Sequence, residues 1–255
     1  FKKIVPLWSA LFIIFVLGTH NAMKFHLILA LSLGGALLAN GASIAYNSLV
    51  QSDGAITHYG FDEAGGTTAV DAIAGADGTY TGAVNLSAAS LPGLGTAADL
   101  AGGFVAVPNL GSFSATSAEV WLQVDALAAG CCTSIASAGS WSSQALHWNL
   151  KSDFAFEHAV NGQGNSNSTS NAFVADSTTW YHLVVTQNAG DTTTFVNGVA
   201  VPDNGVDHAG PIDFGNSNFQ IGAWNGARLL DGRMDEFAVY GHALTPEQVL
   251  AHYEA

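Results

Sequence analysis

Adjacent acidic residues occur twice in this sequence, as Asp62-Glu63 and Asp235-Glu236. Two carboxyl groups that face each other, roughly 5 to 9.5 Å apart, can hydrolyse a glycosidic bond, and carboxylate oxygens also bind Ca²⁺. In a β-strand, however, successive side chains point to opposite faces of the sheet. We therefore predict that Asp235 shares a face with Phe237, that Glu236 lies on the other face, and that the members of each pair do not act on one substrate.

Charge is distributed very unevenly along the chain. All twenty acidic residues lie after position 50, where the only basic residues are Lys151, Arg228 and Arg233, so this part carries a formal charge of −17. Such a surface repels phosphate-rich polymers, and we predict no nucleic-acid partner. It favours cations instead, of which Ca²⁺ is the natural candidate.

The N-terminal region resembles a targeting segment. Residues 23–45 begin with Met-Lys, continue with an apolar stretch and end in small residues, which predicts a signal peptide that is cut before Tyr46. Residues 1–22 are interpreted as an upstream artefact of the start site or an extended leader, with a membrane hairpin as the alternative. Neither apolar run reaches the ~20 residues that a membrane span needs. We expect a protein that is secreted or held at the cell surface, with no stable membrane span in the mature chain.

The only cysteines are neighbours, Cys131 and Cys132. Export permits disulfides, but an ordinary bridge joins Cα atoms that lie farther apart than those of adjacent residues. A bridge between neighbours and a pair of reduced thiols both stay open, and we favour the reduced thiols.

From residue 46 onward the sequence is typical of an all-β protein, with short alternating segments between clusters of Gly, Asn, Asp and Ser. Asn197-Gly198 predicts a two-residue hairpin turn, because this dipeptide accepts positive φ angles. The Asn- and Ser-rich segment 158–173 is expected to be an exposed loop. Strands are predicted at 55–61, 103–110, 118–127 and 180–187, and the hairpin spans 192–201.

One helix is predicted at the C-terminus, where Thr245 is the cap, Pro246 occupies the first helical position and Gln248 completes a capping box. Val249, Leu250 and Tyr253 are expected to form the apolar face that docks on the strands.

Four stretches together resemble the laminin G-like, concanavalin A-like domain family. They are "HYGFDEAGGTTAVDAIAGADGTYTG", "VWLQVDA", "WYHLVVTQNAGDTTTFVNGVAV" and "FQIGAWNGARLLDGRMDEFAVYGHALTPEQV", and the resemblance covers about residues 53–255. It implies a two-sheet antiparallel jelly-roll sandwich with a short C-terminal helix, in which residues 46–255 form one domain. It also implies a structural Ca²⁺ between the acidic residue of the first strand and the Asp of the last, which match Asp62 and Asp235.

Catalysis is not predicted. Related β-glucanases carry acidic residues at alternate positions of one strand, whereas the strand at 118–127 separates Glu119 from Asp125 by six positions. The histidines at 147, 158, 182 and 208 lack a metal-ligand spacing such as His-x-His and are expected to be scattered. A Gly-x-Ser-x-Gly elbow is also missing from the sequence.

A binding function is the leading prediction. Trp141 and Trp224 lie in Gly-, Ser- or Asn-containing segments, and Asn225 and Arg228 follow the second tryptophan. Indole faces with nearby polar groups are typical of sugar sites, so these four residues are the candidate contacts for a carbohydrate or glycoprotein partner. The alternatives are a structural protein that associates with itself and, less favoured, a glycan-active enzyme.

Overall fold

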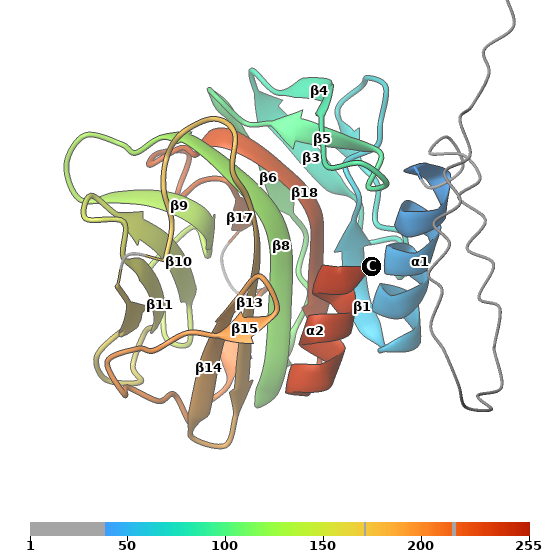
Figure 1. Ribbon diagram of the computed structural model, residues 1–255. Coiled ribbons are helices and arrows are strands. Elements are labelled where there is room, and N and C mark those ends of the chain that lie inside the picture. Colours follow the sequence, from blue (N-terminus) through green and yellow to red (C-terminus); the bar gives the residue numbers. More distant parts are fainter. Residues whose placement is uncertain (1–38, 171, 216–217) are drawn as a thin grey trace, which may run out of the picture. The chain divides into compact units, whose positions relative to one another are not determined.

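The computed structural model describes residues 39–170, 172–215 and 218–255 (Figure 1). The leader predicted at 1–22 and most of the predicted signal peptide lie outside these residues. Helix α1 (Ala39–Ser52) includes the predicted cut after Ala45, and the expected cleavage stays a prediction. None of the helices in the described ranges is long and apolar enough to cross a membrane.

Strands are the main secondary structure of the described residues and form two large sheets and one small pair. Sheet A contains β1 (Ala55–Tyr59), β4 (Asn85–Ala89), β5 (Thr96–Asp99), β8 (Ala115–Ala126), β13 (Trp180–Asn188), β14 (Asp191–Val196), β15 (Val199–Ala200) and β18 (Asp231–Tyr240). Sheet B contains β2 (Thr68–Ala69), β3 (Gly78–Gly82), β6 (Gly103–Val107), β9 (Cys132–Ser137), β10 (Leu146–Lys151), β11 (Phe156–Val160), β12 (Asn167–Thr169) and β17 (Phe219–Ile221). The small pair is β7 (Ser112–Phe113) with β16 (Ile212–Asp213).

The sheets have a non-sequential strand order. Sheet A runs β15-β14-β13-β8-β18-β5-β4, with β1 also on β18, and sheet B runs β12-β11-β10-β9-β17-β6-β3-β2. Neighbouring strands are antiparallel, as in the pairing of β8 with β13 and of β9 with β10. The predicted two-sheet antiparallel sandwich is confirmed.

Local signals in the sequence explain several of these elements. The turn at Asn197-Gly198 has φ angles of 51° and 76° and joins β14 to β15, which confirms the hairpin. β6 ends at Val107, directly before Pro108. The predicted strands at 118–127 and 180–187 correspond to β8 and β13 at the centre of sheet A.

The two sheets enclose one apolar core, to which β8 contributes Val120, Leu122 and Val124. β10 faces it across the sandwich with Leu146, Trp148 and Leu150. Each such side chain contributes about 1.5–3 kcal/mol to stability when fully buried. The intervening residues of both strands point to the outer faces of the sheets, and these two faces differ.

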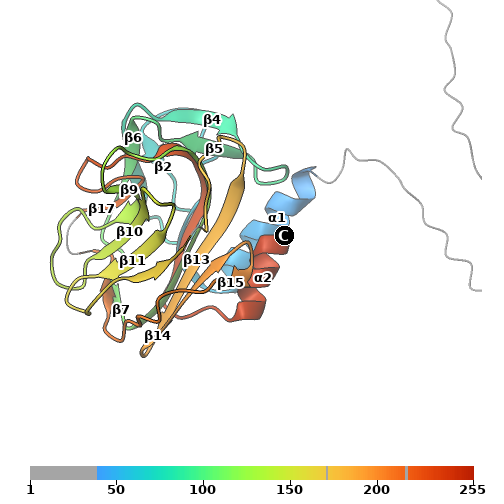
Figure 2. The ribbon, with the colours of Figure 1, turned by 60° about the vertical axis from the view of Figure 1, so that its left-hand side comes forward.

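Helices α1 and α2 (Pro246–Glu254) cover the outer face of sheet A (Figures 1 and 2). Thr245 and Gln248 form the predicted capping box. The predicted docking face is only partly correct, because Leu250 is 40% and Tyr253 38% exposed, while Val249 and His252 are buried.

Helix α1 is not among the predicted elements. Its described side chains Tyr46 and Val50 are fully buried in an apolar cluster that also contains Val249 of α2 and Tyr240 of β18. Both buried residues follow the predicted cut, so a chain that starts at Tyr46 keeps them. Helix α1 is stabilised by this packing rather than by capping residues that a sequence pattern reveals.

The prediction of an exposed loop at 158–173 is wrong in two places. Residues 158–160 end β11, and Asn167–Thr169 form the edge strand β12. Asn167 is buried, and its amide nitrogen donates to Asp203 Oδ2 at 2.9 Å and to the carbonyl of Val206 at 2.8 Å. A buried amide with such partners is tolerated in a strand that its polarity alone would exclude.

Candidate functional site

The outer face of sheet B carries the polar residues of β10. Because Leu146, Trp148 and Leu150 point into the core, the alternating residues His147, Asn149 and Lys151 point outward. In register with them lie Ser137, Ser134 and Cys132 of β9. This surface, the outer face of sheet B around β9, β10 and β17, is called the open face below.

Two tryptophans from different loops lie on either side of His147. The ring centroid of Trp141 is 4.3 Å from that of His147, and the centroid of Trp224 is 5.6 Å from it on an edge-to-face contact. The guanidinium carbon of Arg228 lies 4.4 Å from the Trp224 ring centroid. Residues far apart in the sequence therefore form one row of aromatic and cationic groups.

A tight turn presents Trp224 and Arg228. Trp224 and Ala227 exchange backbone hydrogen bonds of 2.9 Å in both directions around Asn225-Gly226, whose φ angles are 49° and 67°. These values match a two-residue turn of the kind that Asn-Gly favours. The carbonyl of Arg228 accepts a hydrogen bond of 2.8 Å from the amide of Ser134, which fixes the turn to β9.

Several polar atoms of the open face have no partner among the described residues. They are His147 Nε2, Asn149 Oδ1 and Trp224 Nε1, and each is shielded from solvent. Unsatisfied buried polar atoms are rare in native proteins and call for a ligand, an ordered water or a functional role. Burial, followed by the positive charge of Arg228, lowers the pKa of His147 to about 4, against a smaller upward effect of Glu157. His147 is thus neutral at pH 7 and offers one donor and one acceptor.

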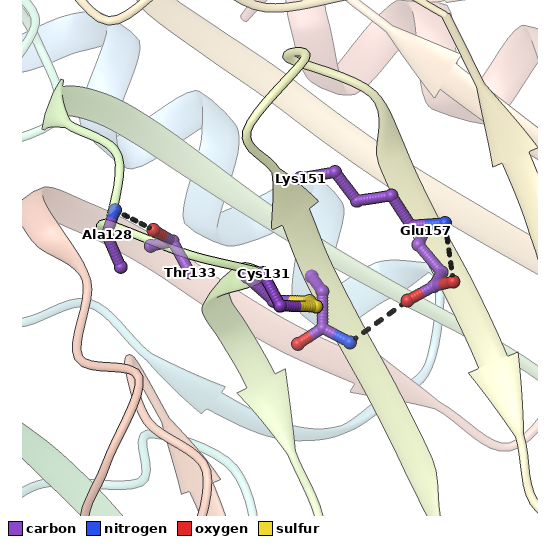
Figure 3. Close-up of a disulfide and its surroundings, with 7 residues drawn as sticks. Ala128, Cys131, Thr133, Lys151 and Glu157 are labelled. Atoms are coloured by element: carbon purple, nitrogen blue, oxygen red, sulfur yellow. Dashed lines mark hydrogen bonds and ion pairs between the residues drawn. A yellow bond between two sulfur atoms is a disulfide. The ribbon is translucent and has the colours of Figure 1, made fainter.

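The far end of the open face combines a disulfide with an ion pair (Figure 3). Cys131 and Cys132 are bonded to each other, so the preference for reduced thiols is wrong. A trans peptide separates their Cα atoms by 3.8 Å, and the turn before β9 still lets the sulfurs meet. Next to this bridge, Lys151 Nζ lies 2.8 Å from Glu157, which also accepts a hydrogen bond from Asn149 at 3.3 Å.

The Asp235-Glu236 pair lies on the outer face of sheet A, and the prediction of opposite faces is wrong. Asp235 is paired with the outward Trp121 of β8, whereas Phe237 points into the core. A bulge follows Asp235, with Glu236 in a left-handed backbone conformation at φ 54°. One extra residue in the strand breaks the alternation, so both carboxylates point outward.

Partners surround these carboxylates. Glu236 Oε2 lies 2.5 Å from His58 Nε2, and Ser90 donates a hydrogen bond to Asp235 Oδ2. Burial, then the charges of Glu236 and Asp62, raise the pKa of Asp235 well above its ordinary value. Asp62 thus acts electrostatically on Asp235, while its own Oδ1 accepts a hydrogen bond of 2.7 Å from the Thr96 amide, and the predicted calcium pair stays a prediction.

Only some of the groups around Asp235 are suited to hold a cation. Asp235 Oδ1 is buried without a partner, and a carboxylate crowded by two others is stabilised by a positive charge. A cavity of about 300 Å³ beside Gly60 is lined by His58, Asp62 and Glu63. In the described ranges, however, three or more His, Cys, Asp or Glu side chains are nowhere grouped to hold a metal. A cation here would rely on Asp62, Asp235 and backbone carbonyls.

Glu119, the nearest sequence candidate for a catalytic acid, is sealed beneath the helices. Its carboxylate is fully buried and lies 3.0 Å from both His182 Nε2 and His252 Nδ1, and the Tyr240 hydroxyl donates to it. Burial alone would raise the pKa of Glu119, but the two histidines outweigh burial and hold it well below its ordinary value. Of the four histidines expected to be scattered, His158 and His208 instead lie together, with ring centroids 5.1 Å apart, and His182 is joined through Glu119 to His252.

The structure brings together three of the four residues predicted to bind a ligand: Trp141, Trp224 and Arg228. Asn225 is exposed in the turn, and no contact of its side chain with these rings is seen among the described residues. Sequence reasoning missed His147, which connects the two tryptophans. Alternation along the strand of Trp148 would have placed His147 on the outer face, and the Asn-Gly signal used at 197–198 would have identified the second turn.

Comparison with solved structures gives the same fold. Domain 4 of AbnA, an extracellular arabinanase from Geobacillus stearothermophilus in complex with arabinotriose, matches with TM-score 0.63 and 20% identity over 78% of this chain and 98% of that domain. Trypanosoma rangeli sialidase in complex with sialic acid matches with TM-score 0.59 and 13% identity, over 87% of this chain and 39% of the sialidase. The receptor-binding domain of botulinum neurotoxin mosaic serotype C/D matches with TM-score 0.57 and 15% identity, over 79% of this chain and 51% of that one.

No curated protein matches the sequence. The family model described as the concanavalin A-like lectin/glucanases superfamily matches residues 99–250, which contain most of both sheets and the whole open-face row. The chain belongs to the concanavalin A-like lectin/glucanases superfamily.

Proposed function

We propose that the chain is an exported, non-catalytic module that binds carbohydrate or a glycoconjugate on the open face. The observation that carries the proposal is the row of Trp141, His147 and Trp224, in which two indoles flank a neutral imidazole with an unpartnered nitrogen. Sugar sites combine aromatic faces with a few fixed polar groups, and this row has both.

The row can hold a sugar through two kinds of contact. The half-exposed ring of Trp141 can cover the C–H face of a sugar ring, since it is 47% accessible. His147 Nε2, Asn149 Oδ1 and Trp224 Nε1 are shielded from solvent, so they can exchange hydrogen bonds with hydroxyls when the side chains around them move. A ligand that satisfies these atoms removes a desolvation cost of about 1–3 kcal/mol for each of them.

The structural neighbours support a carbohydrate ligand. The matching arabinanase domain is in complex with arabinotriose, and the matching sialidase with sialic acid. At 20% and 13% identity these likenesses concern the fold, and the ligand class of this chain rests on its own residues.

The absence of catalysis is part of the same proposal. Glu119 has no exposed surface and its oxygens are already bonded to His182, His252 and Tyr240. A general acid must reach the proton that it transfers, and this carboxylate reaches only the chain itself.

A glycan-binding screen of the purified protein tests the function. We expect binding to at least one plant or bacterial oligosaccharide in the wild type and loss of that binding in Trp224→Ala. The matched control is Tyr253→Ala, which removes a 38% exposed aromatic from α2 on the opposite side of the sandwich. Melting temperatures of all three proteins establish that they are folded. A folded wild type that binds no glycan, or a Trp224→Ala variant that binds as well as the wild type, contradicts the proposal.

We also propose a structural Ca²⁺ held by Asp62 and Asp235. The buried, unpartnered Asp235 Oδ1 supports it. A cation that binds only the folded state at a hundred times its Kd adds about 2.7 kcal/mol of stability. Melting temperatures with Ca²⁺ and with EDTA should differ in the wild type and agree in Asp62→Asn and Asp235→Asn. Equal values in the wild type argue against the ion.

Self-association is the alternative function. It is favoured by exposed apolar side chains beside the β14–β15 turn, where Val199 is 63%, Leu250 40% and Tyr253 38% exposed. A molecular mass that rises with concentration, and that stays constant in Leu250→Glu, would support assembly. A concentration-independent monomer removes this alternative.

A further inference from the structure

The open face holds two of the three basic residues in the strongly acidic part of the chain. Arg228 and Lys151 lie on it, and Arg233 lies on β18 in sheet A. Three residues spread over two sheets always leave at least two on one of them, so the case for an anionic ligand depends on what each cation contacts rather than on their number.

The two cations differ in what they already bind. Lys151 is neutralised by Glu157 at 2.8 Å. The guanidinium of Arg228 contacts the Trp224 ring and has neither an ion pair nor a hydrogen bond to any residue of the described ranges. Within the described ranges its N–H donors are thus not engaged by another residue.

The position of Arg228 is fixed by the fold. Its backbone is left-handed at φ 51°, a conformation that costs energy for a residue with a Cβ, and its carbonyl is held by the Ser134 amide. The side chain then lies over Trp224, which in turn contacts His147. Ten other non-glycine residues of the described ranges share this backbone conformation, so what distinguishes Arg228 is an unpaired guanidinium held over an indole.

At His147 the charge of Arg228 acts more strongly than that of Glu157. Arg228 lowers the pKa of His147 more than Glu157 raises it, even though the chain as a whole is acidic. The indole face below the guanidinium stabilises the cation without occupying its N–H edge.

We propose that the open face selects glycans that bear a carboxylate, such as uronic-acid oligosaccharides, and that Arg228 receives this carboxylate while Trp224 supports the guanidinium and His147 contacts the sugar ring. The planar fork of a guanidinium matches the two oxygens of a carboxylate in paired N–H···O bonds. This inference rests on the proposed carbohydrate function and names the ligand class of the same site.

The test uses matched acidic and neutral oligosaccharides. The pairs are galacturonan and galactan, mannuronan and mannan, and glucuronan and glucan, with a sulfated galactan as a fourth anionic probe. Affinities are measured by calorimetry for the wild type, Arg228→Gln, Arg228→Lys and the control Arg233→Gln. Arg233→Gln removes the same charge from the other sheet, so it corrects for the net charge.

We expect the acidic member of at least one pair to bind about ten to a hundred times more tightly than its neutral counterpart, which is the range for charge-assisted hydrogen bonds. Arg228→Gln should abolish this preference, with a larger loss of affinity for the acidic member of the pair than for the neutral one. Arg228→Lys should retain part of it, and Arg233→Gln all of it.

Three results would overturn the inference. Equal affinity for both members of every pair, with neutral binding present, removes the carboxylate and leaves the carbohydrate function intact. If Arg233→Gln reduces the preference for the acidic glycan as much as Arg228→Gln does, the preference comes from net charge alone. Tighter binding of the sulfated galactan than of every uronate assigns Arg228 to sulfate esters. Failure of all probes with a folded wild type instead removes the carbohydrate function itself.

Discussion

The outer faces of the two sheets use similar residues for opposite purposes. Both carry tryptophans, histidines and carboxylates, although the tryptophans over sheet B, Trp141 and Trp224, come from loops. On sheet A, helices α1 and α2 cover these groups, and Glu119 is bonded to His182 and His252. In the described ranges no helix lies over β9 and β10 of sheet B, and no carboxylate of those ranges pairs with Arg228 (Figure 1). Unpartnered polar atoms occur on both faces, as at His182 Nδ1 and His147 Nε2, so the faces differ in their cover and in their ion pairs.

This difference separates a stabilising network from a binding surface. A buried charge is tolerated when the chain supplies its counter-charge, as Asp53 and Glu119 do for His252 at 3.0 Å each. A cation without a counter-charge inside the chain needs one from outside or from solvent. The type of residue is therefore less informative than whether the chain itself completes its bonds.

The largest effect is expected from breaking the covered network. Glu119→Gln removes the buried negative charge that faces His182 and His252, and one partner lost from a buried ion pair costs about 3–5 kcal/mol. We expect the free energy of unfolding to fall by this amount in urea titrations. The exposed Glu254→Gln on α2 is the control and should change stability by less than about 0.5 kcal/mol. A similarly small change in Glu119→Gln would mean that the network is not charged.

The open face should respond in the opposite way. Trp141→Ala removes a side chain that is half exposed, so its unfolding free energy should change by about 0.5 kcal/mol or less. Its affinity for the best glycan ligand should fall by about 2 kcal/mol, or roughly thirtyfold, as for an aromatic anchor. Calorimetry and urea titration on the same sample compare the two effects. A variant that loses stability but not affinity would reverse the assignment of the two faces.

The two faces should also differ in their response to pH. Burial opposes the charge on His252, but Glu119 and Asp53 outweigh burial and raise its pKa. The raised pKa contributes stability that is complete below the unfolded value of 6.5 and is lost as the pH rises through the folded value. The lowered pKa of Glu119 contributes stability that is complete above the unfolded value of 4.5 and is lost in acid.

We therefore expect the melting temperature to be highest between about pH 4.5 and 6.5 and to fall by a few degrees toward pH 9. His252→Gln should flatten the alkaline decline. His147 loses its proton near pH 4. Its titration should therefore not change the glycan affinity between about pH 5 and pH 9. An alkaline decline of equal size in His252→Gln would assign the effect to other groups.

Sequence patterns predict those structural elements that depend on residues close together in the chain. The Asn197-Gly198 turn, the capping box of Thr245 and the central strand β8 all follow from local rules, and the structure confirms them. The bulge at Glu236 does not, because a period of two assumes that no residue is inserted. That single inserted residue reversed the predicted orientation of the Asp235-Glu236 pair.

The part of the candidate site that the sequence predicts also depends on residues close together in the chain. Gly, Ser and Asn residues surround Trp141 and Trp224 in the sequence, and this local pattern indicates that the two indoles are candidate ligand contacts. His147 joins them only in the folded sheet, and the burial of Glu119 depends on helices from both ends of the chain. Contacts between distant segments are what neither composition nor spacing can supply.

The smallest effect should come from the disulfide at the far end of the open face. Cys132 lies opposite Lys151 on β10, four residues or about 13 Å along the strand from His147, so only a ligand longer than one sugar ring reaches both. The bridge joins adjacent residues and closes no long loop, and the double variant Cys131→Ala, Cys132→Ala should lose about 0.5 kcal/mol of stability or less. Its affinity should fall about twofold for oligosaccharides and stay unchanged for monosaccharides. An equal loss for both would place the disulfide within the row around His147 rather than at the end of a longer site.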